Sequence, residues 1–329
     1  FQTARELAVY LDSPTPQPTH PTLALQIDLS LCYRLPAFRC LHDPLTTELN
    51  QVLLKRFGFI RERMICQSQV AWQIAQLTEG DLVILMLVDG LSYADVKRYA
   101  PQWLPYAKPV LVDGVSETEQ GMLRIVGDPP LAYQLFDQGF RRLLGFTYWE
   151  REQEPLTQRL FAGFGDQVRR VRSFSQALNI LEREELRGAF VQIVRAGLDE
   201  MAHRHRETCN LAAEVEGIFR DMGLLSDLVR KKGLSGILHM ISDHGILWAQ
   251  EHQLTEYEFT SDAHPRYYEY AKQGKYVLNV TFREREFALL AYPFLRRSLR
   301  ANEWGVHGGL SFEESVVPWI LYPIAGARQ

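Results

Sequence analysis

An uninterrupted apolar stretch, Leu82–Val88, limits the possible folds of this chain more than any other segment, and it ends at Asp89-Gly90. Seven apolar residues in a row are typical of a strand that is buried on both faces, as in a parallel sheet. In open α/β sheets, ligands bind at the carboxyl ends of the strands. We therefore expect Asp89 to be a metal ligand at the end of a central strand.

Strands and helices are predicted to alternate along the rest of the chain. Apolar runs predict further strands at residues 109–112, 142–148, 167–171, 189–194, 235–241, 275–282 and 316–322. Amphipathic spacing predicts helices at residues 44–77, 93–99, 118–126, 131–138, 156–164, 176–184 and 207–232. This alternation is typical of βαβ units, so the predicted fold class is α/β, with a mostly parallel central sheet flanked by helices.

Composition changes near the N-terminus. Residues 1–42 are rich in proline, which breaks regular structure. We predict that residues 1–78 form an N-terminal arm and a helical segment, and that residues 79–329 form the main domain. The net charge of −4 argues against a general polyanion-binding surface, although it leaves room for a local positive pocket.

The cysteines and the apolar runs bear on the cellular compartment. The four cysteines form no C-x-x-C pair, so we expect free, buried thiols in a reducing compartment; they are Cys32, Cys40, Cys66 and Cys209. No apolar run reaches the roughly 18 residues that a membrane span needs, and no signal peptide is evident. A cytoplasmic protein without membrane contact is the expectation.

Acidic and histidine residues stand at four places, each at the end of a predicted strand or in a loop. In isolation, each has an ordinary explanation as a turn, a solvated helix pair or a packed histidine. Together they offer three carboxylates and three imidazoles, a ligand set better suited to zinc or manganese than to calcium or magnesium. These residues are Asp89, Asp199, His203, Asp243, His244 and His307.

Two hydroxyl residues, Ser116 and Thr118, precede the predicted helix at residues 118–126. Such residues commonly cap a helix N-terminus, and that is the ordinary interpretation of both. Beside two metal ions, either hydroxyl could instead be a nucleophile, because the helix dipole and a cation both favour an alkoxide. The nearby Asp113-Gly114 is interpreted as a plain turn.

These residues, in this order, resemble the alkaline phosphatase superfamily, and within it they are most similar to the PglZ domain. The resemblance extends from about residue 80 to residue 320, and residues 1–78 lie outside it. The matching pieces are Leu87–Leu91, Ser116-x-Thr118 followed by Arg124, Asp199-x-x-x-His203, Ser242–Gly245 and His307–Pro318.

The resemblance implies an alkaline-phosphatase-like sandwich with a two-metal site. One metal would take Asp199, His203 and His307, and the other Asp89, Asp243, His244 and the oxygen of Thr118. Thr118 would be the nucleophile, with Ser116 as the alternative, because Val115 stands where the family usually has a proline. The candidate substrate-binding residues are Ser116, Arg124, His264 and Arg266, although His264 and Arg266 could equally cap or pack.

The implied function is a metal-dependent phosphodiesterase or nuclease that forms a phosphothreonine intermediate. The implied cofactors are two divalent ions, zinc first, with manganese or magnesium as alternatives. PglZ-like proteins are associated with BREX-type phage defence, so nucleic acid and other defence proteins are the expected partners. Basic clusters at residues 169–172 and 296–297 could guide a nucleic-acid backbone or be solvated faces. The alternatives are a phosphomonoesterase or phosphomutase, and a metal-binding scaffold subunit of a defence complex.

Overall fold

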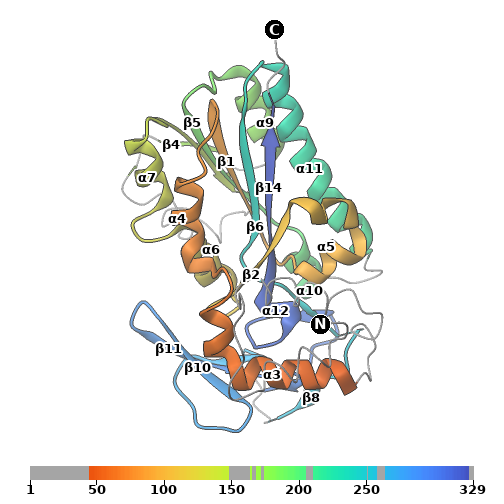
Figure 1. Cartoon of the computed structure of the whole chain (residues 1–329). Helices are drawn as coiled ribbons and strands as arrows, with labels where there is room; N and C mark the ends of the chain where they lie inside the picture. Colours follow the sequence, from red (N-terminus) through yellow and green to blue (C-terminus); the bar gives the residue numbers. More distant parts are fainter. Residues whose placement is uncertain are drawn as a thin grey trace.

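A seven-stranded sheet forms the centre of the computed structural model, which describes residues 44–147, 164, 168–171, 174–204, 210–249, 251–257 and 264–325 (Figure 1). Its strands are, in spatial order, β2 (Ala107–Leu111), β14 (Val316–Ile324), β6 (Gly236–Ser242), β1 (Leu82–Val88), β5 (Ala189–Arg195), β3 (Arg142–Thr147) and β4 (Val168–Val171). Only β14 runs antiparallel to its neighbours in this sheet. The predicted α/β fold with a mostly parallel sheet is confirmed.

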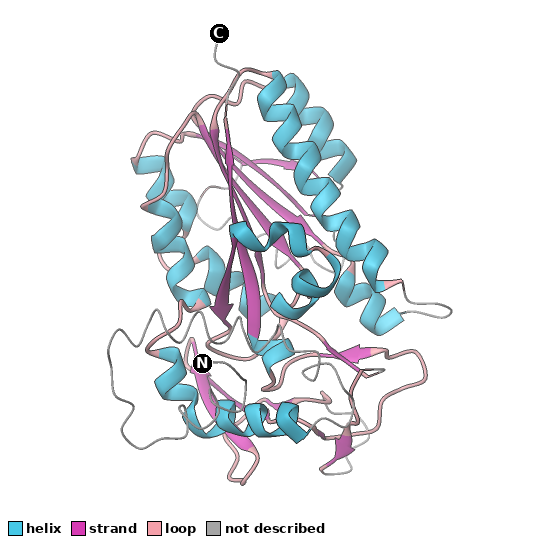
Figure 2. Ribbon diagram, turned by 45° about the vertical axis from the view of Figure 1, so that its right-hand side comes forward, coloured by secondary structure: helices cyan, strands magenta, loops and turns pink. Residues whose placement is uncertain are grey.

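Strand β1 is buried along its whole length because helices cover both faces of the sheet (Figure 2). Its residues 82, 84, 86 and 88 pack with α5 (Tyr93–Tyr99), α9 (Phe174–Arg183), α10 (Leu198–Arg204) and α11 (Leu211–Lys231). Its residues 83, 85 and 87 pack with α4 (Val70–Ala75), α6 (Thr118–Val126) and α7 (Leu131–Asp137). Two-sided burial explains why this strand is apolar without alternation.

A long excursion between β6 and β14 lies at the carboxyl ends of the parallel strands, in the lower part of Figure 1. It contains β10 (Val277–Phe282), β11 (Arg285–Leu290) and β9 (Tyr267–Tyr268), which form one small sheet. The two-residue pairs are β7 (Leu247–Trp248) with β13 (Gly305–Val306), and β8 (Thr255–Glu256) with β12 (Phe294–Leu295). The short helix α12 (Phe312–Ser315) leads back into β14.

Helix α3 (Pro44–Arg61) packs against this excursion. Its Leu53 and Ile60 are fully buried in a cluster that also contains Phe287 and Leu310. The short helices η2 (Gln67–Gln69) and η3 (Pro101–Tyr106) complete the list of described elements. The boundary at residues 78/79 stays a prediction, but α3 and α4 share hydrophobic clusters with residues that follow it.

Some predicted features fall outside the described residues. They are the arm at residues 1–42, the helix at residues 156–164 apart from Phe164, the first residues of the helix at 207–232, and Cys32, Cys40 and Cys209. Cys66 is buried and free, as predicted. The sequence patterns predict neither β11 nor the two-residue strands. Within the described part of the chain, no helix is long and apolar enough to cross a membrane.

Candidate metal centre and nucleophile

Three adjacent parallel strands bring three aspartates to one edge of the sheet. Asp89 follows β1, Asp243 follows β6, and Asp199 lies in the first turn of α10, just after β5. The Asp89 amide donates to Arg195 O at 3.0 Å, and the Asp243 amide donates to Val88 O at 3.1 Å. These bonds extend the strand pairing by one residue, so the backbone fixes where Asp89 and Asp243 stand.

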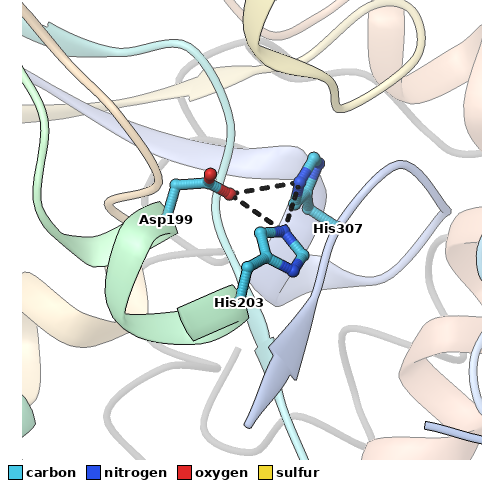
Figure 3. A group of neighbouring side chains, drawn as sticks. All are labelled: Asp199, His203 and His307. Atoms are coloured by element: carbon cyan, nitrogen blue, oxygen red, sulfur yellow. Dashed lines mark hydrogen bonds and ion pairs between the residues drawn. The ribbon is translucent and has the colours of Figure 1, made fainter. Parts of the chain in front are cut away.

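The first cluster consists of Asp199, His203 and His307 (Figure 3). Asp199 Oδ1 lies 3.2 Å from His203 Nε2 and 3.1 Å from His307 Nε2. The two Nε2 atoms are 3.0 Å apart. One helical turn brings Asp199 and His203 to the same side of α10, as predicted, whereas His307 arrives from the loop after β13. Asp199 and His203 are half-buried, so this cluster borders solvent.

The second cluster consists of Asp89, Asp243 and His244, all buried. His244 Nε2 lies 3.5 Å from Asp89 Oδ1 and 3.6 Å from Asp243 Oδ2. The rings of His244 and His307 stack with centroids 4.2 Å apart, so the two clusters lie side by side. The six aspartates and histidines among the seven predicted ligands therefore lie in two adjoining groups.

Backbone carbonyls orient the two stacked imidazoles. His307 Nδ1 lies 2.8 Å from Ser116 O, and His244 Nδ1 lies 3.1 Å from Gly245 O. A carbonyl only accepts, so each Nδ1 carries the proton and donates it. The lone pair of a neutral ring is then on Nε2, which faces the carboxylates. This is the arrangement by which metal-binding histidines are usually held.

Burial and mutual repulsion make two of the three carboxylates, Asp89 and Asp243, hard to ionise. Burial, then the charges of Asp199 and Asp243, raise the pKa of Asp89 well above its usual range. Burial also raises the pKa of Asp243. Burial opposes ionisation of Asp199 too, but its contacts with His203 and His307 hold the pKa of that carboxyl well below its usual range.

The donor set fits divalent cations. Asp243 Oδ1 accepts from the amides of Gly90 and His244, which leaves Oδ2 buried with no hydrogen-bond partner among the described residues. In each cluster the three ligand atoms lie within 4.8 Å of one another. Cations would neutralise crowded carboxylates and separate two Nε2 atoms that otherwise face each other. Mixed imidazole and carboxylate ligands suit zinc or manganese.

The hydroxyl of Thr118 faces the second cluster. Thr118 Oγ1 lies 3.1 Å from His244 Nε2 and 3.3 Å from Asp89 Oδ1, and the residue is half-buried. Ser116 is fully buried, and its hydroxyl donates to Gly309 O at 3.3 Å. Neither hydroxyl caps the helix, contrary to the ordinary interpretation of both. The cap is Glu117, whose side chain accepts from the Gln120 amide.

Two arginines considered as substrate ligands are committed to protein groups. Arg266 is fully buried and forms a two-pronged ion pair with Glu314, at 2.6 and 2.9 Å. Arg124 is buried and donates to Gln67 Oε1 and Val115 O. Substrate binding by these two stays a prediction: Arg266 is engaged by Glu314, whereas Nη1 of Arg124 is buried with no hydrogen-bond partner among the described residues. Asp113 is likewise more than a plain turn residue: it is buried, and it accepts from Ser68.

His264 lies near the first cluster, with its ring centroid 5.6 Å from that of His307. Its Nδ1 accepts from the Arg266 amide at 3.3 Å. Burial, then the nearby histidines, lower the pKa of His264 well below its usual range. The neutral ring therefore carries its proton on Nε2, as a hydrogen-bond donor. Of the four candidate substrate-binding residues, His264 keeps the most suitable geometry.

The basic clusters that might guide nucleic acid are also paired where they are described. Arg297 is buried against Glu303, at 2.6 and 2.7 Å. Arg296 donates to Tyr267 O and stacks 3.8 Å above the Tyr268 ring. Arg169 contacts Glu184, whereas Arg172 and the side chain of Arg170 lie outside the described part of the chain.

Sequence analysis missed the supports of the centre. Gln67 is fully buried and donates to the carbonyls of Ser242 and Asp243 at 3.0 and 2.6 Å. No spacing rule links residues so far apart in the chain. Glu117 carried a local signal, because Glu117-x-x-Gln120 has the spacing of a helix start, although glutamate is not a preferred cap.

Comparisons with known proteins reveal partial similarity of fold. No protein-family model and no curated protein matches the sequence. Human ectonucleotide pyrophosphatase/phosphodiesterase 5 gives a TM-score of 0.49 at 11% identity, over 74% of this chain and 88% of its own. Phosphonoacetate hydrolase from Sinorhizobium meliloti 1021, in complex with phosphonoacetate, gives 0.49 at 10%, over 74% and 90%. The inactive murine phosphodiesterase 5 with AMP gives 0.48 at 9%, over 73% and 87%. No activity is assigned to this chain from these values.

Proposed function

We propose that the protein is a metal-dependent phosphoester hydrolase of the alkaline phosphatase superfamily, with Thr118 as its nucleophile. One observation carries the proposal: a half-exposed hydroxyl at a helix N-terminus lies 3.1 Å from an imidazole, within one of two adjoining carboxylate–imidazole clusters. The cofactors would be two divalent cations, zinc first. When bound, they would supply Lewis acidity that stabilises charge on the attacking and leaving oxygens.

The protein's own groups suit an in-line displacement. Thr118 Oγ1 attacks phosphorus, a phosphothreonine forms, and the leaving alkoxide departs. Asp89 Oδ1 and His244 Nε2, the atoms nearest the hydroxyl, would hold the cation that acidifies it, and the hydroxyl proton passes to solvent. The N-terminus of α6 favours negative charge on the oxygen. His264 Nε2–H is the candidate donor to a phosphoryl oxygen. Water then cleaves the phosphothreonine and releases phosphate or a phosphomonoester.

A phosphodiester is the preferred substrate class within this proposal. A phosphomonoester brings two negative charges, and a diester brings one. Arg124 and Arg266, the cations that would hold the second charge, are tied to Gln67 and Glu314 instead. These contacts compete with phosphate binding by either arginine, which favours the diester. Phosphomonoesterase or phosphomutase activity is the same-class alternative.

The finer assignment rests on sequence motifs. The PglZ-like segments, above all His307–Pro318, support assignment to the phage-defence proteins and make oligonucleotides the first natural substrates to test. A metal-binding scaffold in a defence complex is the rival of a different class. Metal-replete protein that binds a defence partner yet hydrolyses no phosphoester would favour the scaffold.

The central test compares two hydroxyl deletions. Thr118→Val keeps the shape of the side chain and should lower kcat for bis-nitrophenyl phosphate by on the order of 10³-fold or more. Ser116→Ala is the matched control and should retain most of the turnover. Acid quenching and mass spectrometry should find phosphate on Thr118 in the wild type. Turnover by Thr118→Val with an inactive Ser116→Ala would transfer the role of nucleophile to Ser116.

Chelation should abolish activity, and added Zn²⁺ or Mn²⁺ should restore it.

A further inference from the structure

The Glu117 side chain is a carboxylate placed directly beside the proposed nucleophile. It is half-buried, and Oε2 accepts from the Gln120 amide at 3.1 Å. This bond fixes the side chain at the N-terminus of α6, one residue from Thr118. Its position is therefore set by the helix start and does not depend on a bound ligand.

No basic side chain among the described residues forms an ion pair with Glu117. Its charge acts on Arg124 and His307, but the charge of Arg124 is already offset by Asp113, 4.0 Å away. The negative charge of Glu117 affects the pKa of groups on opposite sides of the centre. Burial, followed by Glu117, raises the pKa of the Tyr267 phenol in the excursion. On the sheet side, Glu117 adds to the burial and neighbouring aspartates that raise the pKa of Asp89. Its field thus reaches both a phenol of the excursion and a carboxylate at the end of β1.

This charge changes the balance expected from the ligands alone. Three aspartates against two divalent cations leave one net positive charge. Glu117 cancels it, so the loaded site is neutral before the threonine ionises. Each negative charge on a substrate then meets the repulsion of Glu117 without a surplus cation to offset it.

We propose that Glu117 is a specificity-determining residue whose carboxylate disfavours dianionic phosphomonoesters and so directs the site toward monoanionic phosphodiesters. The inference rests on the proposed function and gives its substrate preference a physical cause. Because Coulomb energy is proportional to charge, the effect of Glu117 on a dianion should be twice that on a monoanion in logarithmic terms.

The test replaces the carboxylate by its neutral isostere. Glu117→Gln keeps an oxygen that can accept from the Gln120 amide. It should raise kcat/KM for mono-nitrophenyl phosphate at pH 8 on the order of tenfold, and for bis-nitrophenyl phosphate about threefold. Glu117→Asp retains the charge and should keep the wild-type ratio between the substrates. Glu119→Gln is the matched control, because residues two apart on a helix do not share a face. It should leave the ratio unchanged.

A binding measurement separates this inference from the proposed function. Inorganic phosphate, mostly a dianion at pH 8, should bind metal-loaded Thr118→Val with a Kd on the order of tenfold higher than the Kd for the Thr118→Val, Glu117→Gln double variant. Equal changes for both substrates in Glu117→Gln, or unchanged phosphate affinity, would overturn the inference. If no phosphoester is hydrolysed but phosphate binding still tightens, the proposed function fails and the charge effect stands.

Discussion

The imidazole of His307 decides whether protons or a cation hold the first cluster together. Burial opposes its protonation, but the contact with Asp199 outweighs burial and raises the pKa of His307 to about 9. The folded pKa lies above the ordinary value of 6.5, so the proton stabilises the metal-free fold. That stabilisation is fully present below pH 6.5 and is lost as the pH rises through about 9.

We therefore expect chelator-treated protein to lose roughly 3 kcal/mol of unfolding free energy between pH 6.5 and pH 9. Urea unfolding at several pH values measures it, and His307→Gln should lack this part of the dependence. Added zinc should raise the melting temperature more at pH 8.5 than at pH 6.5, because the metal displaces the proton. A metal-free protein that gains stability with rising pH would contradict the assignment.

Helix α6 packs closely against the backbone of Asp243, one of the candidate metal ligands. A Cβ on Gly121 would overlap the carbonyl of Asp243. Alanine normally improves a helix interior by about 1 kcal/mol over glycine, but Gly121→Ala should lower the unfolding free energy and weaken metal binding. Gly223→Ala in α11, where a Cβ meets nothing within 4 Å, should show the ordinary gain. Urea unfolding and zinc titration of both variants provide the comparison. Similar gains in both would show that α6 can shift freely.

At the scale of single elements, local sequence patterns predict several helices correctly. The remaining features depend on tertiary contacts, which these patterns do not reveal. The sequence correctly predicts α6 at Thr118–Val126 and α5 at Tyr93–Tyr99, because apolar periodicity and turn signals are local. The six carboxylate and imidazole candidates were identifiable because they follow predicted strand ends or stand in loops. The role of Gly121 was not, because its neighbour lies more than a hundred residues along the chain. The two-residue strands carry no periodicity at all.

For the molecule as a whole, α3 belongs to the same packed body as the excursion. Leu53 is fully buried among residues from the distant part of the chain, whereas Lys55 is exposed. Leu53→Ala should lower the unfolding free energy by roughly 2–5 kcal/mol, as for other buried leucines. Lys55 lies two residues further on, on a different face of the helix. Lys55→Ala should therefore have an unfolding free energy within about 0.5 kcal/mol of wild type. Urea unfolding measures both. A negligible effect of Leu53→Ala on the unfolding free energy would instead indicate that the N-terminal segment is independent of the rest of the fold.

Neither that packing nor the buried arginine network followed from the sequence. Arg124 and Arg266 were candidate substrate-binding residues because they lie in the segments that resemble the family, with capping or packing left open for Arg266. The structure uses them against Gln67 and Glu314, partners that only the tertiary fold brings close. Motif matching finds which residues are near a site, but not which way a long side chain turns.

The position of β14 has a consequence for how the protein is made. β14 follows every other described strand in the chain, yet it lies between β2 and β6. During synthesis, both of these strands must wait with an unpaired edge until residues 316–324 leave the ribosome. Open edges invite pairing with other chains. His307 is synthesised only shortly before β14, so cation loading is expected to be among the last events of biogenesis.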